Sequence, residues 1–169
     1  SGAPFESSIG GRAMLAQISA TIPSITTPSA PLPMGEFPHA RKKSTTRVLV
    51  VDDEPLVRWS IAETLRGHGC SIVEAGDAEG ALAAVLDDAA PPDAVLLDLK
   101  LPDSDDLTLL AAVRKYRPWT PVILMTAFGT PEVLDEARRL GAFTVLDKPF
   151  DVDALEALVE RAIGAPLPS

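Results

Sequence analysis

Runs of apolar residues without polar alternation limit most strongly how this chain can fold. Residues 48–51 read VLVV, residues 94–97 read AVLL, and a third run covers residues 121–125. A strand with one face toward water alternates polar and apolar residues, whereas a strand of a parallel sheet is covered by helices on both faces. The three runs therefore predict buried parallel strands.

Segments with apolar residues at helical spacing follow each predicted strand. Pro55 suits a first helical position, Asp77 can cap a second helix, and Gly141 is a natural stop for a fourth. The other expected elements are two strands, at residues 71–74 and 143–146, a third helix from Leu107 that stops before Pro118, and a last helix, at residues 151–163. Five strand–helix units in strict alternation predict an α/β fold: a five-stranded parallel sheet with right-handed crossovers and helices on both faces.

The composition fits one domain whose core is built from aliphatic side chains. Of 169 residues, 46% are hydrophobic but only 5% are aromatic. The single cysteine, Cys70, excludes an internal disulfide framework and fits a reducing compartment.

The net charge is −9, and because residues 1–46 carry four basic and two acidic residues (+2), the remainder carries −11. A domain this acidic is not expected to bind the DNA backbone.

Residues 1–46 differ in composition from the rest of the chain. They hold six of the 16 prolines and many Ser and Thr residues, which cannot bury enough apolar surface to offset chain entropy. The stretch from Gly11 to Ile22 is too short and too polar to span a membrane, and the pattern of a signal peptide is missing. We expect a disordered, linker-like or tag-like extension over residues 1–46, a folded domain over 47–163 and a tail over 164–169.

Four of the predicted strands end in chemically useful residues, and in a parallel sheet those ends share one edge. The residues are Asp52, Asp53, Asp98, Thr126 and Lys148. Neighbouring carboxylates repel unless a cation compensates them, and oxygen ligands at an open site suit Mg²⁺. A lysine can hold a phosphoryl oxygen, a threonine hydroxyl can donate to another, and an aspartate can attack phosphorus. One such aspartate alone would more often cap a turn; the whole set predicts phosphoryl transfer to an aspartate.

Four segments resemble the receiver domain of bacterial two-component response regulators: VLVVDDE, VLLDLKLP, ILMTAFG and DKPF. The resemblance spans about residues 47–163, and RWSIAETL and GAFTVLDKPF are most similar to receivers of the nitrogen-regulator type. It implies a flavodoxin-like, doubly wound (βα)5 fold with strand order 2-1-3-4-5. It also implies a cytoplasmic phosphoprotein that catalyses its own phosphorylation and dephosphorylation without being a conventional turnover enzyme.

The resemblance assigns a role to each residue at the strand ends. Asp98 is the implied phosphoacceptor, and Thr126 and Lys148 are implied to contact the phosphoryl group. The implied Mg²⁺ ligands are Asp52 (at least through water), Asp53, Asp98 and the backbone carbonyl of Lys100. The Lys148–Pro149 bond is expected to be cis, which is uncommon enough to be informative.

The resemblance also implies partners. The phosphoryl donor is the phosphohistidine of a sensor histidine kinase or a phosphotransfer protein. Phosphorylation is expected to change the face built from residues 130–140, residues 143–146 and the last helix, by homodimerisation or by docking of a partner. Because the chain ends soon after the last predicted helix, no DNA-binding or ATPase module is expected in it. The chain is either a single-domain regulator or a piece of a larger protein, and its output domain or partner protein is expected outside it. Neither nucleic acid nor a membrane is expected to bind this domain.

Three other functions fit parts of the pattern. A degenerate receiver would act as a phosphorylation-independent protein-binding scaffold, which the complete set of five residues disfavours. A haloacid-dehalogenase-type phosphatase needs a second aspartate two residues after the first, where this chain has Lys100. A flavodoxin-like cofactor binder would share the fold, but a carboxylate cluster would repel a flavin phosphate.

Three positions depart from the usual receiver pattern. Asp103 and Asp106 stand where the family often has glycines, which changes the expected turn and adds negative charge near the site. Val145 stands where many members have an aromatic switch residue, so the usual aromatic rotation cannot occur there. Phe128 and Phe143 are candidate substitutes, although ordinary packing is the simpler role for both.

Overall fold

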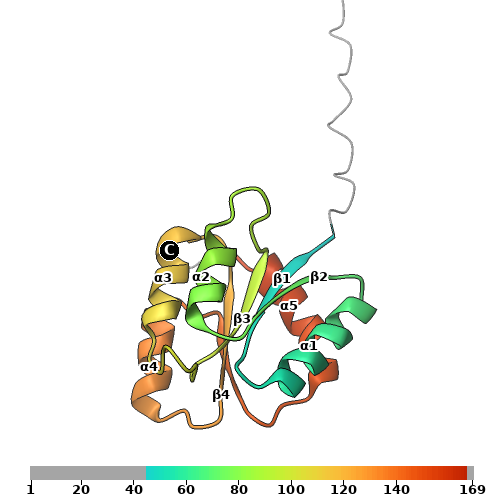
Figure 1. The fold of residues 1–169 in the computed structure, drawn as a ribbon. Coiled ribbons are helices and arrows are strands. Elements are labelled where there is room, and N and C mark those ends of the chain that lie inside the picture. Colours follow the sequence, from blue (N-terminus) through green and yellow to red (C-terminus); the bar gives the residue numbers. More distant parts are fainter. Residues whose placement is uncertain (1–44, 167–169) are drawn as a thin grey trace, which may run out of the picture. The chain divides into compact units, whose positions relative to one another are not determined.

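A five-stranded parallel sheet forms the centre of the structure, a computed structural model that describes residues 45–166 (Figure 1). The strand order is β2-β1-β3-β4-β5, as predicted. The strands are β1 (Arg47–Val51), β2 (Ser71–Ala75), β3 (Ala94–Asp98), β4 (Val122–Thr126) and β5 (Thr144–Asp147). Every residue of β3 and β4 is buried, whereas the edge strands β2 and β5 are mostly half-buried.

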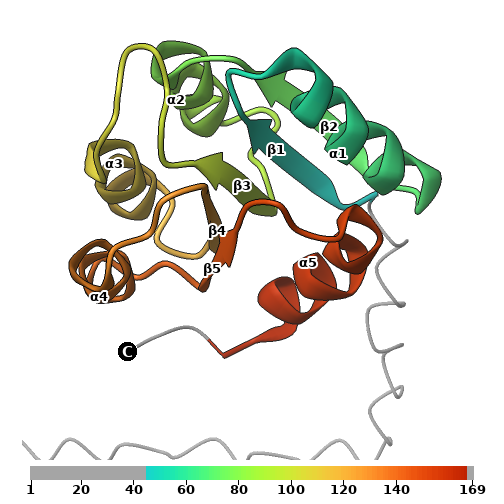
Figure 2. The same ribbon diagram turned by 90° about the horizontal axis from the view of Figure 1, so that it is seen from below.

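Helices cover both faces of this sheet (Figure 2). Within the described residues they are α1 (Pro55–Gly67), α2 (Ala78–Leu86), α3 (Thr108–Tyr116), α4 (Pro131–Arg139) and α5 (Leu155–Gly164). One core contains Val50 of β1 with residues of α1 and α5, and the other contains its neighbour Leu49 with residues of α2, α3 and α4. Successive strand residues point to opposite faces, so an unbroken apolar run fills both cores.

The last helix begins later than the sequence pattern predicts. Residues Val152–Ala154 form a 3-10 turn, and α5 starts at Leu155 instead of Asp151. The Asp151 carboxylate accepts a hydrogen bond from the Asp153 backbone N–H at 3.0 Å, so it caps the 3-10 turn. The apolar face is as predicted, with Leu155, Leu158, Val159 and Ala162 buried.

Several smaller predictions also have an outcome. Gly141 follows α4 with a φ of 90°, a conformation that favours glycine, and it ends the helix as predicted. Cys70 is half-buried. No helix within residues 45–166 is long and apolar enough to cross a membrane. Most of the predicted extension, residues 1–44, and the last three residues of the predicted tail lie outside the described part of the chain.

Candidate functional site

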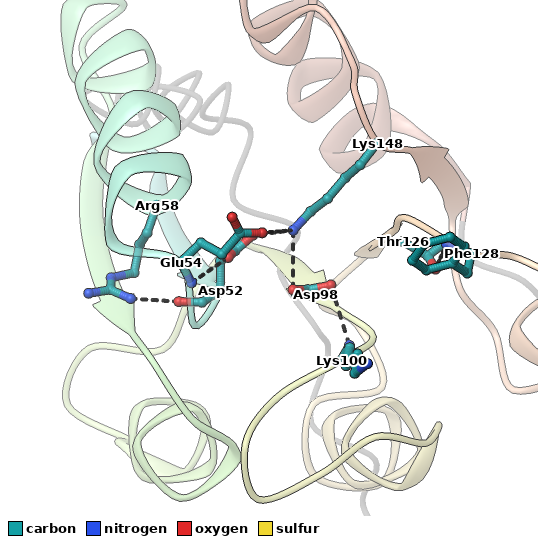
Figure 3. A network of polar contacts seen from close by, with 8 residues as sticks. All are labelled: Asp52, Glu54, Arg58, Asp98, Lys100, Thr126, Phe128 and Lys148. Carbon is teal, nitrogen blue, oxygen red and sulfur yellow. Dashed lines mark hydrogen bonds and ion pairs between the residues drawn. The ribbon is translucent and has the colours of Figure 1, made fainter.

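The predicted site residues meet at one edge of the sheet, where β1, β3, β4 and β5 end. Figure 3 draws all of them except Asp53. Asp52 and Asp53 follow β1, and Lys148 follows β5. Asp98 and Thr126 are the last residues of β3 and β4. Strand β1 lies beside β3 although β2 comes between them in sequence, and such a switch point is where open α/β sheets bind ligands.

Three carboxylates converge at this edge. One oxygen each of Asp52, Asp53 and Asp98 lies within 4.8 Å of the others. Asp52 is 0% exposed and Asp98 is 6% exposed, whereas Asp53 is open to solvent. Buried like charges at this separation destabilise the fold unless a positive charge compensates them.

Lys148 supplies one compensating charge. Its Nζ lies 2.8 Å from Asp52 Oδ2 and 3.2 Å from Asp98 Oδ2, and Glu54 Oε1 is 3.7 Å away (Figure 3). The side chain is only 13% exposed, so little water screens these contacts. Lys148, which follows the edge strand β5, therefore forms ion pairs with the acids at the ends of β1 and β3.

Burial and charge act in opposite directions on the ionisation of this group. Burial raises the pKa of Asp98 above its usual value, and the Asp52 charge adds to this, while Lys148 opposes both. Burial alone would lower the pKa of Lys148, but its hydrogen bonds and charge interactions with Asp52 and Asp98 outweigh that and raise it. Lys148 therefore stays a cation at neutral pH.

Asp52 is fixed by its backbone as well as its side chain. Its carboxylate Oδ1 accepts a hydrogen bond from the Glu54 N–H at 2.9 Å. Its own N–H donates to the Ala75 carbonyl at 3.1 Å, and its carbonyl accepts from Arg58 Nη1 at 2.6 Å. The turn after β1 thus has little freedom to move.

A hollow of about 700 Å³ opens beside the acids. Its walls include Asp53, Asp98, Lys100 and Thr126, with Phe128 84% exposed at the same hollow. The Lys100 N–H donates to Asp98 Oδ1 at 3.3 Å, and Thr126 Oγ1 accepts from the Phe128 N–H at 3.1 Å. The Thr126 hydroxyl keeps its own proton for another acceptor. A ligand in this hollow would contact the acids, the lysine and the hydroxyl together.

Comparison with known proteins identifies the family. The model of the response regulator receiver domain matches residues 48–160. The chain belongs to the response regulator receiver domain family. It is 42% identical over 121 residues to the DNA-binding transcriptional regulator NtrC of Escherichia coli strain K12, across 69% of this chain and 24% of that protein. It is 36% identical over 119 residues to the transcriptional regulatory protein PdtaR of Mycobacterium tuberculosis strain H37Rv, across 70% of this chain and 57% of that protein.

Solved receiver domains have the same fold. The receiver domain of NtrX from Brucella abortus is 39% identical with a TM-score of 0.64, over 70% of this chain and 99% of that one. A CheY-like receiver domain from Methanospirillum hungatei JF-1 is 26% identical with a TM-score of 0.68, over 72% and 95%. The nitrogen-regulator type of receiver, predicted from sequence, is thereby confirmed. The chain spans about a quarter of the length of the NtrC relatives that it matches.

Two departures from the receiver pattern gain a structural role. The Asp103 carboxylate accepts hydrogen bonds from the N–H groups of Ala78 and Glu79 at 2.8 and 3.1 Å, at the start of α2. The Asp106 carboxylate accepts from the Thr108 N–H at 2.8 Å, at the start of α3. The hydrogen bonds from the Ala78 and Glu79 backbone lower the pKa of Asp103, and hydrogen bonding to the side chain and backbone of Thr108 lowers the pKa of Asp106. The turn that lacks the usual glycines is therefore tied to two helix N-termini, which favour negative charge.

The other predicted features of the receiver domain are also visible. The Lys148–Pro149 bond is cis, as the resemblance implies. Val145 is half-buried and packs against the core on the α2, α3 and α4 face. Phe143 is 39% exposed. Val145 thus belongs to the packing that supports α4.

The acid cluster has the donor set that suits a divalent cation. Its ligands are all carboxylate oxygens, which Mg²⁺ prefers, and the adjoining hollow leaves room for the waters that this ion usually keeps. Receiver domains generally bind Mg²⁺ at such a cluster. The residues of this chain therefore fit the metal that the family implies.

Sequence reasoning missed Arg58 as part of this site. It lies on the first turns of α1, six residues after the acid that it contacts, and its guanidinium reaches back to the end of β1. One sequence pattern could have identified Arg58: it is an arginine within two helical turns of the acid pair that ends a strand. The contact itself depends on the angle at which α1 leaves the sheet, which the sequence pattern does not specify.

Proposed function

We propose that Asp98 of this receiver domain accepts a phosphoryl group from the phosphohistidine of a sensor kinase or phosphotransfer protein. The observation that carries the proposal is the setting of the Asp98 carboxylate. It is buried at the end of a central strand, lines an open hollow, and lies 3.2 Å from a lysine ammonium. That arrangement supports a nucleophile that is held still and reached from one side only.

The proposed step needs no covalent chemistry beyond the two reacting groups. An Asp98 carboxylate oxygen forms a bond to phosphorus, and the bond from phosphorus to the histidine nitrogen breaks with its electron pair leaving on that nitrogen. Lys148 holds one phosphoryl oxygen, and the hydroxyl proton of Thr126 is donated to another. Both groups already line the hollow, so they are placed before the donor arrives.

We further propose which residues hold Mg²⁺. Asp53 is the direct ligand, because its exposed carboxylate lines the hollow. Asp52 acts at least through water, because it is fully buried and, unlike Asp53 and Asp98, does not line the hollow. Asp98 and the backbone carbonyl of Lys100 complete the set. The bound cation supplies positive charge against the phosphoryl oxygens.

The response is proposed to pass to α4, β5 and α5. The Thr126 carbonyl accepts a hydrogen bond from the Lys148 N–H at 2.7 Å, so the ends of β4 and β5 are joined directly. A phosphoryl group that draws both side chains inward makes contacts that differ between two states, which is what a conformational switch requires. Because Val145 replaces an aromatic residue, backbone and Thr126 carry the shift.

The test is the intact mass of the chain after treatment with acetyl phosphate and Mg²⁺. We expect one added phosphoryl group on the parent and none on Asp98→Asn, with a label that hydroxide removes. Asp105→Asn is the matched control, because Asp105 lines the same hollow and its replacement should leave labelling intact. Equal labelling of Asp98→Asn would reject the assignment. An unlabelled parent would instead favour the phosphorylation-independent scaffold.

A further inference from the structure

The turn between β1 and α1 is held by a side chain that has no place in the proposed chemistry. Arg58 Nη1 donates to the backbone carbonyl of Asp52 at 2.6 Å (Figure 3). The side chain is 21% exposed. A charged guanidinium that donates to a buried carbonyl makes one of the stronger hydrogen bonds available to a backbone group.

The carbonyl that Arg58 holds determines the direction of the next residue. The Asp52 carbonyl and the Asp53 N–H belong to one planar peptide unit, so fixing the carbonyl oxygen fixes the bond that leads to the Asp53 Cα. The Asp53 carboxylate itself makes no hydrogen bond or ion pair within residues 45–166. Its convergence to within 4.8 Å of Asp52 and Asp98 therefore depends on the backbone that carries it.

Arg58 is itself held in place from β2. Its Nε lies 3.5 Å from Glu74 Oε2, and the other oxygen of Glu74 accepts from Arg66 Nη2 at 2.7 Å. A second nitrogen of Arg66 donates to Glu63 at 2.8 Å. Arg58 and Arg66 thus share one carboxylate, but in the described residues only Arg58 also reaches the acid site.

We propose that Arg58 is a positioning residue for the metal site: it orients the Asp52–Asp53 peptide so that the Asp53 carboxylate is presented to the cation. The inference deepens the proposed function and rests on it. Hydrogen bonds behind metal ligands typically change metal affinity by roughly 10- to 100-fold when they are removed. Here Arg58 donates its hydrogen bond to the peptide group that links Asp52 and Asp53, the two proposed ligands that follow β1.

A simpler role for Arg58 makes the opposite prediction. If Arg58 only adds positive charge near three acids, then its removal lowers the repulsion felt by an incoming cation and Mg²⁺ binds more tightly. If it positions Asp53, then its removal weakens binding although the site has become more negative. The sign of the change separates the two roles.

The experiment measures Mg²⁺ binding by titration calorimetry for the parent, Arg58→Gln, Arg58→Lys and the matched control Arg66→Gln, with folding checked by circular dichroism. Arg66→Gln removes the same charge from the same helix and frees the same Glu74, without touching Asp52. We expect Arg58→Gln to bind roughly 10-fold more weakly than Arg66→Gln, at the lower end of the range for such residues. Arg58→Lys should also be weaker than the parent, because a lysine keeps the charge but cannot hold the carbonyl and Glu74 together.

Two results would overturn the inference. One is Arg58→Gln binding Mg²⁺ at least as tightly as Arg66→Gln. The other, which decides the matter if Arg58→Gln does not fold, is Arg58→Lys binding as tightly as the parent. A parent chain that fails to bind Mg²⁺ would contradict the proposed metal site instead, so the two failures are distinguishable.

Discussion

The site has two sides that differ in how firmly they are held. The α1 side consists of the β1–α1 turn and α1; the α4 side consists of the β4–α4 turn, α4 and β5. On the α1 side Asp52 is fully buried and all its polar groups have partners, namely Ala75, Glu54, Arg58 and Lys148. Asp52 cannot shift without breaking several of these contacts.

The α4 side is packed more loosely. Helix α4 buries only Ala137, whereas α5 buries four side chains. All residues of β5 are half-buried or exposed. Phe128, in the turn before α4, is 84% exposed.

The contrast teaches how one domain can combine chemistry with signalling. Phosphoryl transfer needs oxygen ligands that are fixed before the donor arrives. A response needs an element that lies near the low end of local stability, with few buried apolar contacts. In this receiver Asp52 and Asp53 stand on the firmly held α1 side and the proposed switch lies on the more loosely packed α4 side. Lys148 is hydrogen-bonded to both, through Asp52 and through the Thr126 carbonyl.

The largest expected effect tests whether the buried contacts that hold Asp52 in place contribute more stability than an exposed ion pair on α4. Lys148→Met should lower the free energy of unfolding by about 3 kcal/mol, because it leaves Asp52 and Asp98 buried without their cation. Urea denaturation in EDTA measures this. Arg138→Ala is the control, since its pair with Asp135 on α4 is exposed and should contribute less than about 1 kcal/mol. Equal losses in both variants would remove the distinction between the sides.

The second prediction separates metal binding from stability at the same acids. Asp53→Ala should weaken Mg²⁺ binding more than any other single acid substitution, and without metal it should raise the thermal midpoint by relieving repulsion. Calorimetry and thermal melts in EDTA give the two readouts, with Asp105→Ala as control. No Mg²⁺ response of the parent up to tens of millimolar would refute the site, since even millimolar affinity is about 4 kcal/mol.

The third prediction concerns how long the acyl phosphate survives. Phe128 and Lys100 line the hollow where a hydrolytic water would approach Asp98, and neither can act as a base for it. Phe128→Ala and Lys100→Asn should each lose the phosphoryl group several-fold faster in Mg²⁺ buffer, because less bulk then excludes water. Phe143→Ala, which lies away from the hollow, should match the parent. Unchanged or slower loss in both variants would rule out shielding.

The smallest expected effect is the conformational change that phosphorylation causes in α4, β5 and α5. Phosphorylation should move the amide resonances of α4 and β5 by more than those of α1, because the loosely packed side responds to Thr126 and Lys148. Helix α5, which follows Lys148 in the chain, should shift with them. Two-dimensional NMR spectra before and after acetyl phosphate provide the comparison. Shifts confined to the loop after Asp98, with α4 and β5 silent, would contradict the proposed route.

The strands and the strand-end residues could be predicted because each depends on a local signal. An apolar run identifies a buried strand, and in a parallel sheet the residue after the run must lie at one known edge. Asp52 and Lys148 are 96 residues apart, yet both were expected in one site for this reason. The strand order followed from the family resemblance.

The contacts that the sequence did not reveal depend on how elements lie against each other. Asp103 meets the start of α2 at a separation of 25 residues, and Arg58 reaches the Asp52 carbonyl only because of the angle of α1. The late start of α5 has a local cause, since Asp151 can cap either a 3-10 turn or an α-helix. A hydrophobic pattern does not distinguish between those two.

The long separation between Lys148 and the acids also affects the order in which the chain can assemble. Lys148 is synthesised after Asp52 and Asp98, so a pairing of β1 with β3 before β5 joins the sheet brings two carboxylates together without their lysine. Domains generally fold as units during synthesis, from the N-terminus onward. In this chain the acid cluster therefore gains its lysine only when β5, the last strand, has joined the sheet.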